Sequence, residues 1–151
     1  MKEVRGKTSR RRAREVALQA LYAWQLAGGE AGETVEQAKT LEGWERCDAA
    51  LAEALIRGVL ERAQALEALI SPCLDTRSFS ELSPVERAIL YIGAFELSIH
   101  VETPFKVVIN EAIELGKSFG GTDGYRFVNG VLEKLADSLR PQEFAGARQP
   151  A

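Results

Sequence analysis

The chain of 151 residues contains very few of the side chains that form disulfides or hold metals. It has two cysteines and one histidine. Cys47 and Cys73 lie far apart and fit neither a CxxC motif nor a metal-ligand spacing, so we expect two reduced structural thiols. His100 stands beside an expected helix end without a nucleophile motif nearby, and we expect it at the surface or at a helix cap. The composition therefore indicates no disulfide framework, no metal site and no cofactor.

Long hydrophobic runs and catalytic motifs are also missing. No apolar segment approaches the roughly 18 residues that a membrane span requires, and no secretory signal follows the charged amino terminus. We therefore expect a cytoplasmic protein that does not contact a membrane. The sequence has no HExxH motif, nucleophile elbow, Walker motif or cofactor fingerprint, and its glycine-rich segment 120–124 lacks the GK[ST] ending of a phosphate loop. These absences argue against an enzyme.

Strand signals are absent as well, whereas helical periodicity runs through most of the chain. No segment combines strict alternation of apolar and polar residues with β-branched enrichment and hairpin turns. Apolar residues at helical spacing predict helices over about residues 9–27, 34–41, 51–69, 84–99, 105–119 and 125–139, with a turn or short helix within 73–82. The predicted fold class is all-α, a compact bundle of about seven helices.

Particular side chains mark the ends of several of these helices. Ser83 is expected to cap the helix that begins at the next residue, with Glu86 completing a capping box. Thr103, which also precedes a proline, repeats this signal for the following helix. Gly116, inside that helix, is expected to allow close contact with another helix. The last helix is expected to end at Arg140, followed by a frayed tail.

The main charged feature is a basic tract at the amino terminus. Residues 1–14 carry seven of the nineteen basic side chains and one acidic one, a balance of +6 that leaves −9 for residues 15–151. The seven are Lys2, Arg5, Lys7, Arg10, Arg11, Arg12 and Arg14. Each cation at a helix amino terminus costs roughly 0.3 to 1 kcal/mol, because the helix dipole already places positive charge there. Phosphate oxygens would reverse this cost, so we favour nucleic acid as the partner over a solvated basic tail.

Aromatic residues favour RNA over duplex DNA. Tyr22 and Trp24 follow the basic tract on the same expected helix, where they could offer stacking surface to unpaired bases. Trp24 shares the apolar stripe that includes Ala17 and Leu21, so a place in the core is its stronger interpretation. Tyr22 lies off that stripe, and both interpretations stay open for it.

Three segments are more specific than helical periodicity. They are RRRAREVALQALYAWQ, LSPVERAILYIGAFEL and TPFKVVINEAIELGKSFGGTDGYRFVNGVLEKL. Together they resemble the NusB family of bacterial transcription antitermination factors over almost the whole chain, with residues 27–51 matching least. The resemblance implies two packed three-helix halves with an additional short helix. It also implies binding of the boxA element of rRNA leader transcripts together with NusE, a small-subunit ribosomal protein, and loading of further Nus factors onto RNA polymerase.

The resemblance carries over to individual positions. It places the family's arginine-rich motif and the neighbouring RNA-facing tyrosine on Arg10, Arg11, Arg12, Arg14 and Tyr22. It implies that the RNA and partner surfaces are lined or flanked by Glu86, Phe119, Asp123 and Phe127. Strong matches also fall on Asn110, Glu111, Asn129 and Gly130, and for the last two we expect a role in helix packing.

The expected organisation is a basic flexible arm over residues 1–9, a NusB-like helical domain over residues 10–141 and a flexible tail over residues 142–151. The preferred hypothesis is a non-catalytic RNA-binding adaptor whose acidic body docks a basic ribosomal protein. One alternative is a helical bundle that binds proteins alone. Another is a fragment related to rRNA cytosine methyltransferases, although no βαβ region with a glycine-rich turn is present. A homodimer that covers the RNA arm also stays open.

Overall fold

Helices account for all regular secondary structure in the computed structural model, which describes residues 7–121 and 124–148. The predicted all-α class is confirmed, with eight α-helices in this described part of the chain. None of these helices is long and apolar enough to cross a membrane. The chain divides into two compact units, residues 1–61 and residues 62–151, and their boundary falls inside the helical domain expected over residues 10–141.

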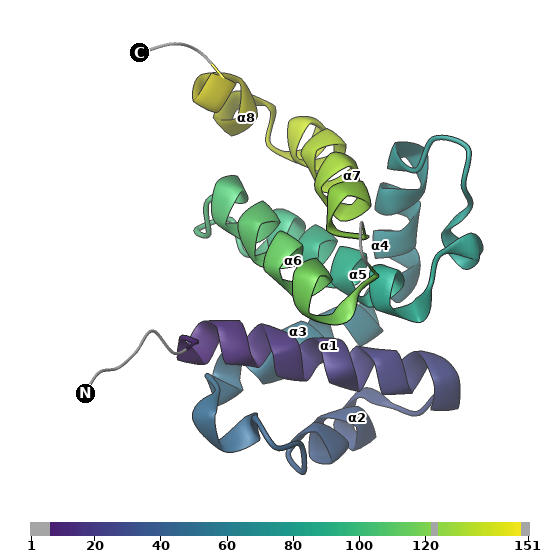
Figure 1. The fold of residues 1–151 in the computed structure, drawn as a ribbon, viewed down its shortest axis with the longest axis vertical. Helices are drawn as coiled ribbons and strands as arrows, with labels where there is room; N and C mark the ends of the chain where they lie inside the picture. The colour runs from purple at the N-terminus through teal and green to yellow at the C-terminus, as the bar shows by residue number, and fades with distance from the viewer. Residues whose placement is uncertain (1–6, 122–123, 149–151) are drawn as a thin grey trace. The chain divides into compact units, whose positions relative to one another are not determined.

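The first unit contains three α-helices and a short 3-10 helix (Figure 1). They are α1 (Ser9–Ala27), α2 (Ala31–Ala38), η1 (Trp44–Arg46) and α3 (Ala49–Glu61). The hydroxyl of Thr8 caps α1 by accepting the backbone N–H of Arg11 at 3.0 Å. Gly28 ends the helix with a φ of 77°, a conformation that favours glycine. The three α-helices pack on one another in every pairing.

A break in a predicted helix marks the boundary between the units. The sequence predicts one helix over residues 51–69, but α3 ends at Glu61 and α4 (Ala63–Ile70) follows Arg62, whose φ of −123° and ψ of 19° interrupt the helix. α3 packs on α1 and α2, whereas α4 packs on α5 (Pro84–Ile99). Because Val59 and Leu66 are both buried, apolar spacing continues across the break and does not reveal it.

The second unit is organised around α5. This helix packs on α4, on α6 (Phe105–Phe119) and on α7 (Gly124–Leu139), with the 3-10 helices η2 (Ser71–Cys73) and η3 (Phe79–Glu81) before it. The predicted capping box is confirmed, since Ser83 Oγ accepts the backbone N–H of Glu86 and Glu86 Oε1 accepts that of Ser83, both at 3.1 Å. The close contact predicted at Gly116 is also confirmed, because a methyl group there would lie 3.0 Å from Cα of Tyr125.

The described carboxyl-terminal residues form a helix, which overlaps the segment 142–151 that was expected to be a flexible tail. α8 (Pro141–Arg148) follows α7 directly (Figure 1). Its Phe144 is 7% exposed, and its Glu143 Oε2 accepts the backbone N–H of Phe105 at 2.9 Å. Glu143 thereby provides the cap of α6 that was expected from Thr103. The proline at position 141 starts a new helix and does not end helical structure.

Candidate nucleic-acid interface

The first turns of α1 carry basic side chains and no acidic residue in the first turn. Arg10 is exposed, and its Nη1 lies 3.6 Å from Asp48 Oδ2. Lys7 Nζ lies 2.7 Å from Glu15 Oε2. In both pairs the cation is exposed and the carboxylate is half-buried. Ion pairs near the surface contribute roughly 0 to 1 kcal/mol, so they compete weakly with a phosphate for these cations. The basic residues at positions 2 and 5 lie outside the described residues.

The four arginines predicted to contact RNA differ in exposure. Arg10 is exposed, while Arg11 and Arg12 are half-buried. Arg14 is only 3% exposed. It lies three residues before Ala17 on the buried stripe of α1, and this spacing is a signal that the sequence already contained. The accessible part of the motif is therefore its first three arginines, and direct RNA contact by Arg14 stays a prediction.

The two aromatic residues of α1 differ in exposure, as their positions relative to the apolar stripe predicted. Tyr22 is 39% exposed, whereas Trp24 is half-buried. Gln19 follows Arg12 by seven residues, which places these two on one face of the helix, and Tyr22 follows Gln19 by three, which makes it a neighbour of Gln19. The exposed phenol ring next to this face is available for stacking on a base.

A polar pocket of about 430 Å³ opens beside this face of α1. Its lining comes from α1 and from the segment around η1, and comprises Arg12, Glu15, Gln19, Glu42, Gly43, Glu45 and Arg46. Arg46 and its neighbours belong to none of the three family-like segments, since residues 27–51 resemble the family least. The available signal was the charged run around Trp44, which lies next to α1 only after the chain folds.

The predicted site residues of the second unit include two that share a partner. Arg77 Cζ lies 4.5 Å from the ring centroid of Phe127, and Arg77 Nη2 lies 3.5 Å from Glu86 Oε1. The structure thus joins Glu86 and Phe127 through an arginine that sequence reasoning missed. Phe119 is exposed at the end of α6, and Asp123 lies outside the described residues.

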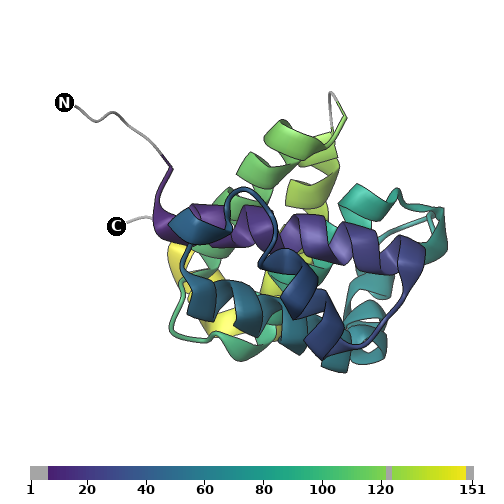
Figure 2. The same ribbon diagram turned by 90° about the horizontal axis from the view of Figure 1, so that it is seen from below.

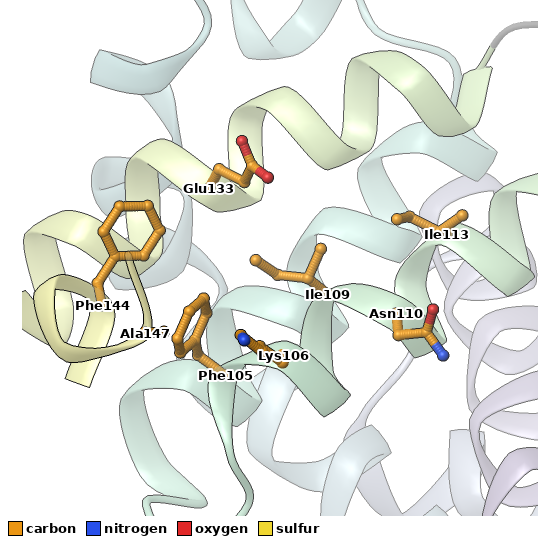
Figure 3. Close-up of a pocket in the computed structure, with 8 residues that line it drawn as sticks. All are labelled: Phe105, Lys106, Ile109, Asn110, Ile113, Glu133, Phe144 and Ala147. Carbon is orange, nitrogen blue, oxygen red and sulfur yellow. The ribbon is translucent and has the colours of Figure 1, made fainter. Parts of the chain in front are cut away.

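A second pocket, of about 290 Å³, lies between α6, α7 and α8 (Figure 3). Its lining is Phe105, Lys106, Ile109, Asn110, Ile113, Glu133, Phe144 and Ala147. Gly130 of α7 lines a neighbouring pocket, and a methyl group on it would meet no atom within 4 Å. The packing role expected for Gly130 is therefore not supported, whereas Asn129 is half-buried.

The described residues hold little that would perform bond chemistry. Burial raises the pKa of the Cys47 and Cys73 thiols, which keeps both in the protonated form that is a poor nucleophile. The backbone N–H of His100 donates to Glu96 O at 3.1 Å at the end of α5, as expected for a cap position. No group of three or more histidine, cysteine, aspartate or glutamate side chains is placed to hold a metal within the described part.

Known proteins resemble this chain over most of its length. Residues 11–137 match the profile of the NusB family. Transcription antitermination protein NusB of Paraburkholderia phytofirmans is 50% identical over 143 residues, covering 95% of this chain and 99% of the relative. The protein of the same name from Burkholderia vietnamiensis is 50% identical over 142 residues, covering 94% and 97%.

Solved structures share the fold. T. maritima NusB aligns with a TM-score of 0.80 and 31% identity, covering 93% of this chain and 99% of that one. A structure of the antitermination factors NusB and NusE in complex with double-stranded RNA contains a chain with a TM-score of 0.71 and 24% identity, covering 85% and 96%. At that identity the second likeness supports the fold alone.

Proposed function

The chain belongs to the NusB family, and we propose that it acts in transcription antitermination by binding boxA RNA of rRNA leader transcripts together with NusE. The curated relatives are named for transcription antitermination, which confirms the prediction of a non-catalytic transcription factor. The rRNA methyltransferase alternative is not favoured, because these relatives match over nearly their whole length and are antitermination proteins.

The cluster of arginines at the start of α1 is the observation that carries the proposal. Arg10, Arg11 and Arg12 lie in the first turns, where the helix dipole disfavours cations, and none of the three is fully buried. RNA phosphates would neutralise these charges and accept charge-assisted hydrogen bonds from the guanidinium groups. Tyr22, exposed further along α1, would add stacking on an unpaired base.

NusE is the proposed protein partner. Residues 15–151 carry a net charge of −9, which suits docking of a basic ribosomal protein. The solved complex of NusB and NusE with double-stranded RNA shows such an assembly for a protein of the same fold. We further propose that the RNA-bound pair joins other Nus factors on RNA polymerase in the cytoplasm. The surface around Arg77 and Phe127 is a candidate for contact with RNA or NusE.

The proposal predicts that the start of α1 contributes salt-dependent RNA affinity. We expect the double variant Arg10→Ala, Arg11→Ala to weaken boxA binding and to lower the slope of log affinity against log salt by about 1.4, because each lost phosphate contact on single-stranded RNA removes about 0.7. Filter binding across a salt series would measure both effects, with boxA and scrambled RNA compared in the presence and absence of NusE.

Arg57→Ala is the matched control, since Arg57 is an arginine of the same unit on α3 and is paired with Glu53 at 2.8 Å. It should leave the salt slope unchanged. An unaltered slope for the double variant, with its helical circular dichroism intact, would remove the role assigned to the α1 arginines. Equal binding of boxA and scrambled RNA, with NusE binding retained, would favour the protein-interaction bundle. The homodimer stays a prediction that analytical ultracentrifugation would check.

A further inference from the structure

Two contacts hold the walls of the polar pocket of the first unit together. The backbone N–H of Asp48 donates to Ser9 O at 3.0 Å, which ties the segment after η1 to the start of α1. Gly43 lies against Val16, to which a methyl group on Gly43 would make an ordinary contact of 3.5 Å. Figure 2 shows the segment between α2 and α3 lying beside α1. The pocket therefore has defined walls, α1 on one side and residues 42–46 on the other.

Among the residues that the structure describes, four charged side chains of this pocket have no ion pair, two of each sign. Within residues 7–121 and 124–148, neither the guanidinium of Arg12 nor that of Arg46 has an ion pair, and the same holds for the carboxylates of Glu42 and Glu45. The remaining lining carboxylate, on Glu15, is paired with Lys7 at 2.7 Å. Two guanidinium groups and two carboxylates are thus available to a ligand. Such a ligand would carry both an anionic group and hydrogen-bond donors.

A nucleotide has this combination of groups. Its phosphate accepts hydrogen bonds from guanidinium groups, and its base can donate N–H groups to a carboxylate, which when ionised can only accept. Guanine presents two neighbouring donors on its Watson–Crick edge, whereas uracil presents one N–H between two carbonyl oxygens that a carboxylate repels. The volume of about 430 Å³ lies within the range of about 300 to 1,000 Å³ usual for small-molecule pockets.

We propose that this pocket binds one unpaired guanine nucleotide of the RNA, with Arg12 and Arg46 on the phosphate and Glu42 or Glu45 accepting from the base. The inference rests on the proposed RNA-binding function and adds a base-specific site to it. Tyr22 is exposed and lies about one turn after Gln19, which lines the pocket with Arg12, so a neighbouring base can stack there. The basic tract then supplies affinity, and the pocket supplies discrimination between bases.

Mononucleotides test the pocket on the full chain. Amide spectra recorded by NMR during titration with GMP should show shifts at Gln19, Gly43, Glu45 and Arg46. IMP differs from GMP only in lacking the 2-amino group, so it should bind about tenfold more weakly, the size expected when one bidentate base contact is lost. UMP should bind more weakly still. Equal affinities for GMP, IMP and UMP, or shifts located elsewhere, would overturn the proposal.

Two variants distinguish the contribution of the phosphate contact to affinity from that of the base contact. Arg46→Ala should weaken GMP and UMP by a similar factor, because it removes a phosphate contact. The double variant Glu42→Gln, Glu45→Gln should weaken GMP about tenfold and leave UMP unchanged or slightly tighter. Arg57→Ala and Glu36→Gln, which alter exposed charges of the same unit outside the pocket, are the matched controls. Pocket variants that behave like these controls would also overturn the proposal.

The test distinguishes a failed pocket from a failed function. If boxA RNA binds with the expected salt dependence but GMP and IMP titrate alike, the pocket is wrong and the RNA-binding function stands. If wild-type protein does not bind boxA RNA more tightly than scrambled RNA, the proposed function fails, and the GMP titration still decides whether the pocket recognises guanine.

Discussion

A single arginine organises the carboxyl end of the second unit. Arg140 Nη1 donates to Thr103 O at 2.6 Å, and its Nη2 donates to Glu96 O and His100 O, each at 3.1 Å. These carbonyls belong to the last turn of α5 and the turn after it, where backbone acceptors have few partners within the helix. Glu96 O also accepts the backbone N–H of His100, and His100 O accepts that of Thr103. Arg140 Nη1 also reaches Glu143 Oε1 at 3.1 Å. The guanidinium therefore satisfies the end of α5 and holds the residue that caps α6.

Glu143 gives this arrangement a dependence on pH. The backbone N–H of Phe105, with help from Arg140, lowers the pKa of Glu143 in the folded protein. Its carboxylate therefore stabilises the fold above the unfolded pKa, and this contribution is lost as the pH falls through the folded pKa. We expect Glu143→Gln to lower the free energy of unfolding at neutral pH, within the roughly 0.5 to 2 kcal/mol of a helix cap and toward its lower end because the group is exposed.

Urea unfolding over an acidic pH series would measure this effect. The difference between wild type and Glu143→Gln should shrink as Glu143 becomes protonated. Glu102→Gln, an exposed glutamate in the turn after α5, is the control and should show a smaller difference throughout. A constant difference between wild type and Glu143→Gln across the series would contradict the capping role of the charge.

Two glycines of neighbouring helices illustrate packing at the scale of elements. A methyl group at Gly116 of α6 would lie 3.0 Å from both Cα and Cβ of Tyr125 on α7. Backbone cannot move aside as the end of a flexible side chain can. A methyl group at Gly130 of α7 would meet no atom within 4 Å. One glycine is therefore required by the approach of two helices, and the other is not.

We expect opposite effects when these glycines are replaced by alanine. Gly130→Ala should stabilise the protein by up to about 1 kcal/mol, because alanine has the higher helix propensity. Gly116→Ala gains the same propensity but forces the helices apart, at a cost of about 1 to 3 kcal/mol for an overpacked site. Thermal and urea unfolding of the two variants would give this ranking. A Gly116→Ala variant as stable as Gly130→Ala would show that α6 and α7 are not in close contact there.

Elements set by local spacing could be predicted from the sequence, and those set by distant contacts could not. The capping box of Ser83 and Glu86 lies within four residues, and the helix start was predicted correctly. The cap of α6 depends on Glu143 reaching Phe105, a contact that spans 38 positions. Likewise, the arginine tract is visible as a run of letters, whereas its pocket needs Arg46 to fold beside α1.

At the scale of the whole chain, the candidate surfaces are distributed between two units. Residues 1–61 contain the basic tract and the polar pocket, while residues 62–151 contain the cluster around Arg77 and the pocket between α6, α7 and α8. Helices α1, α2 and α3 contact one another, and α8 contacts α7 within the second unit. A change in α8 is therefore expected to act on the second unit and to leave the first unit folded.

Phe144 is the residue that tests this division. Its ring centroid lies 5.2 Å from that of Phe105, and it is the buried hydrophobic residue of α8 within the described part. We expect Phe144→Ala to cost up to about 3 kcal/mol, the lower end for a buried phenylalanine, because the adjoining pocket already leaves one side of the ring open. Hydrogen–deuterium exchange should increase in α8 and the first turn of α6 and stay unchanged in α1, α2 and α3.

Gln142→Ala, at an exposed position of the same helix, is the control. Exchange that rises in both units would show that α8 supports the whole chain, and exchange that matches the control would show that Phe144 does not anchor α8.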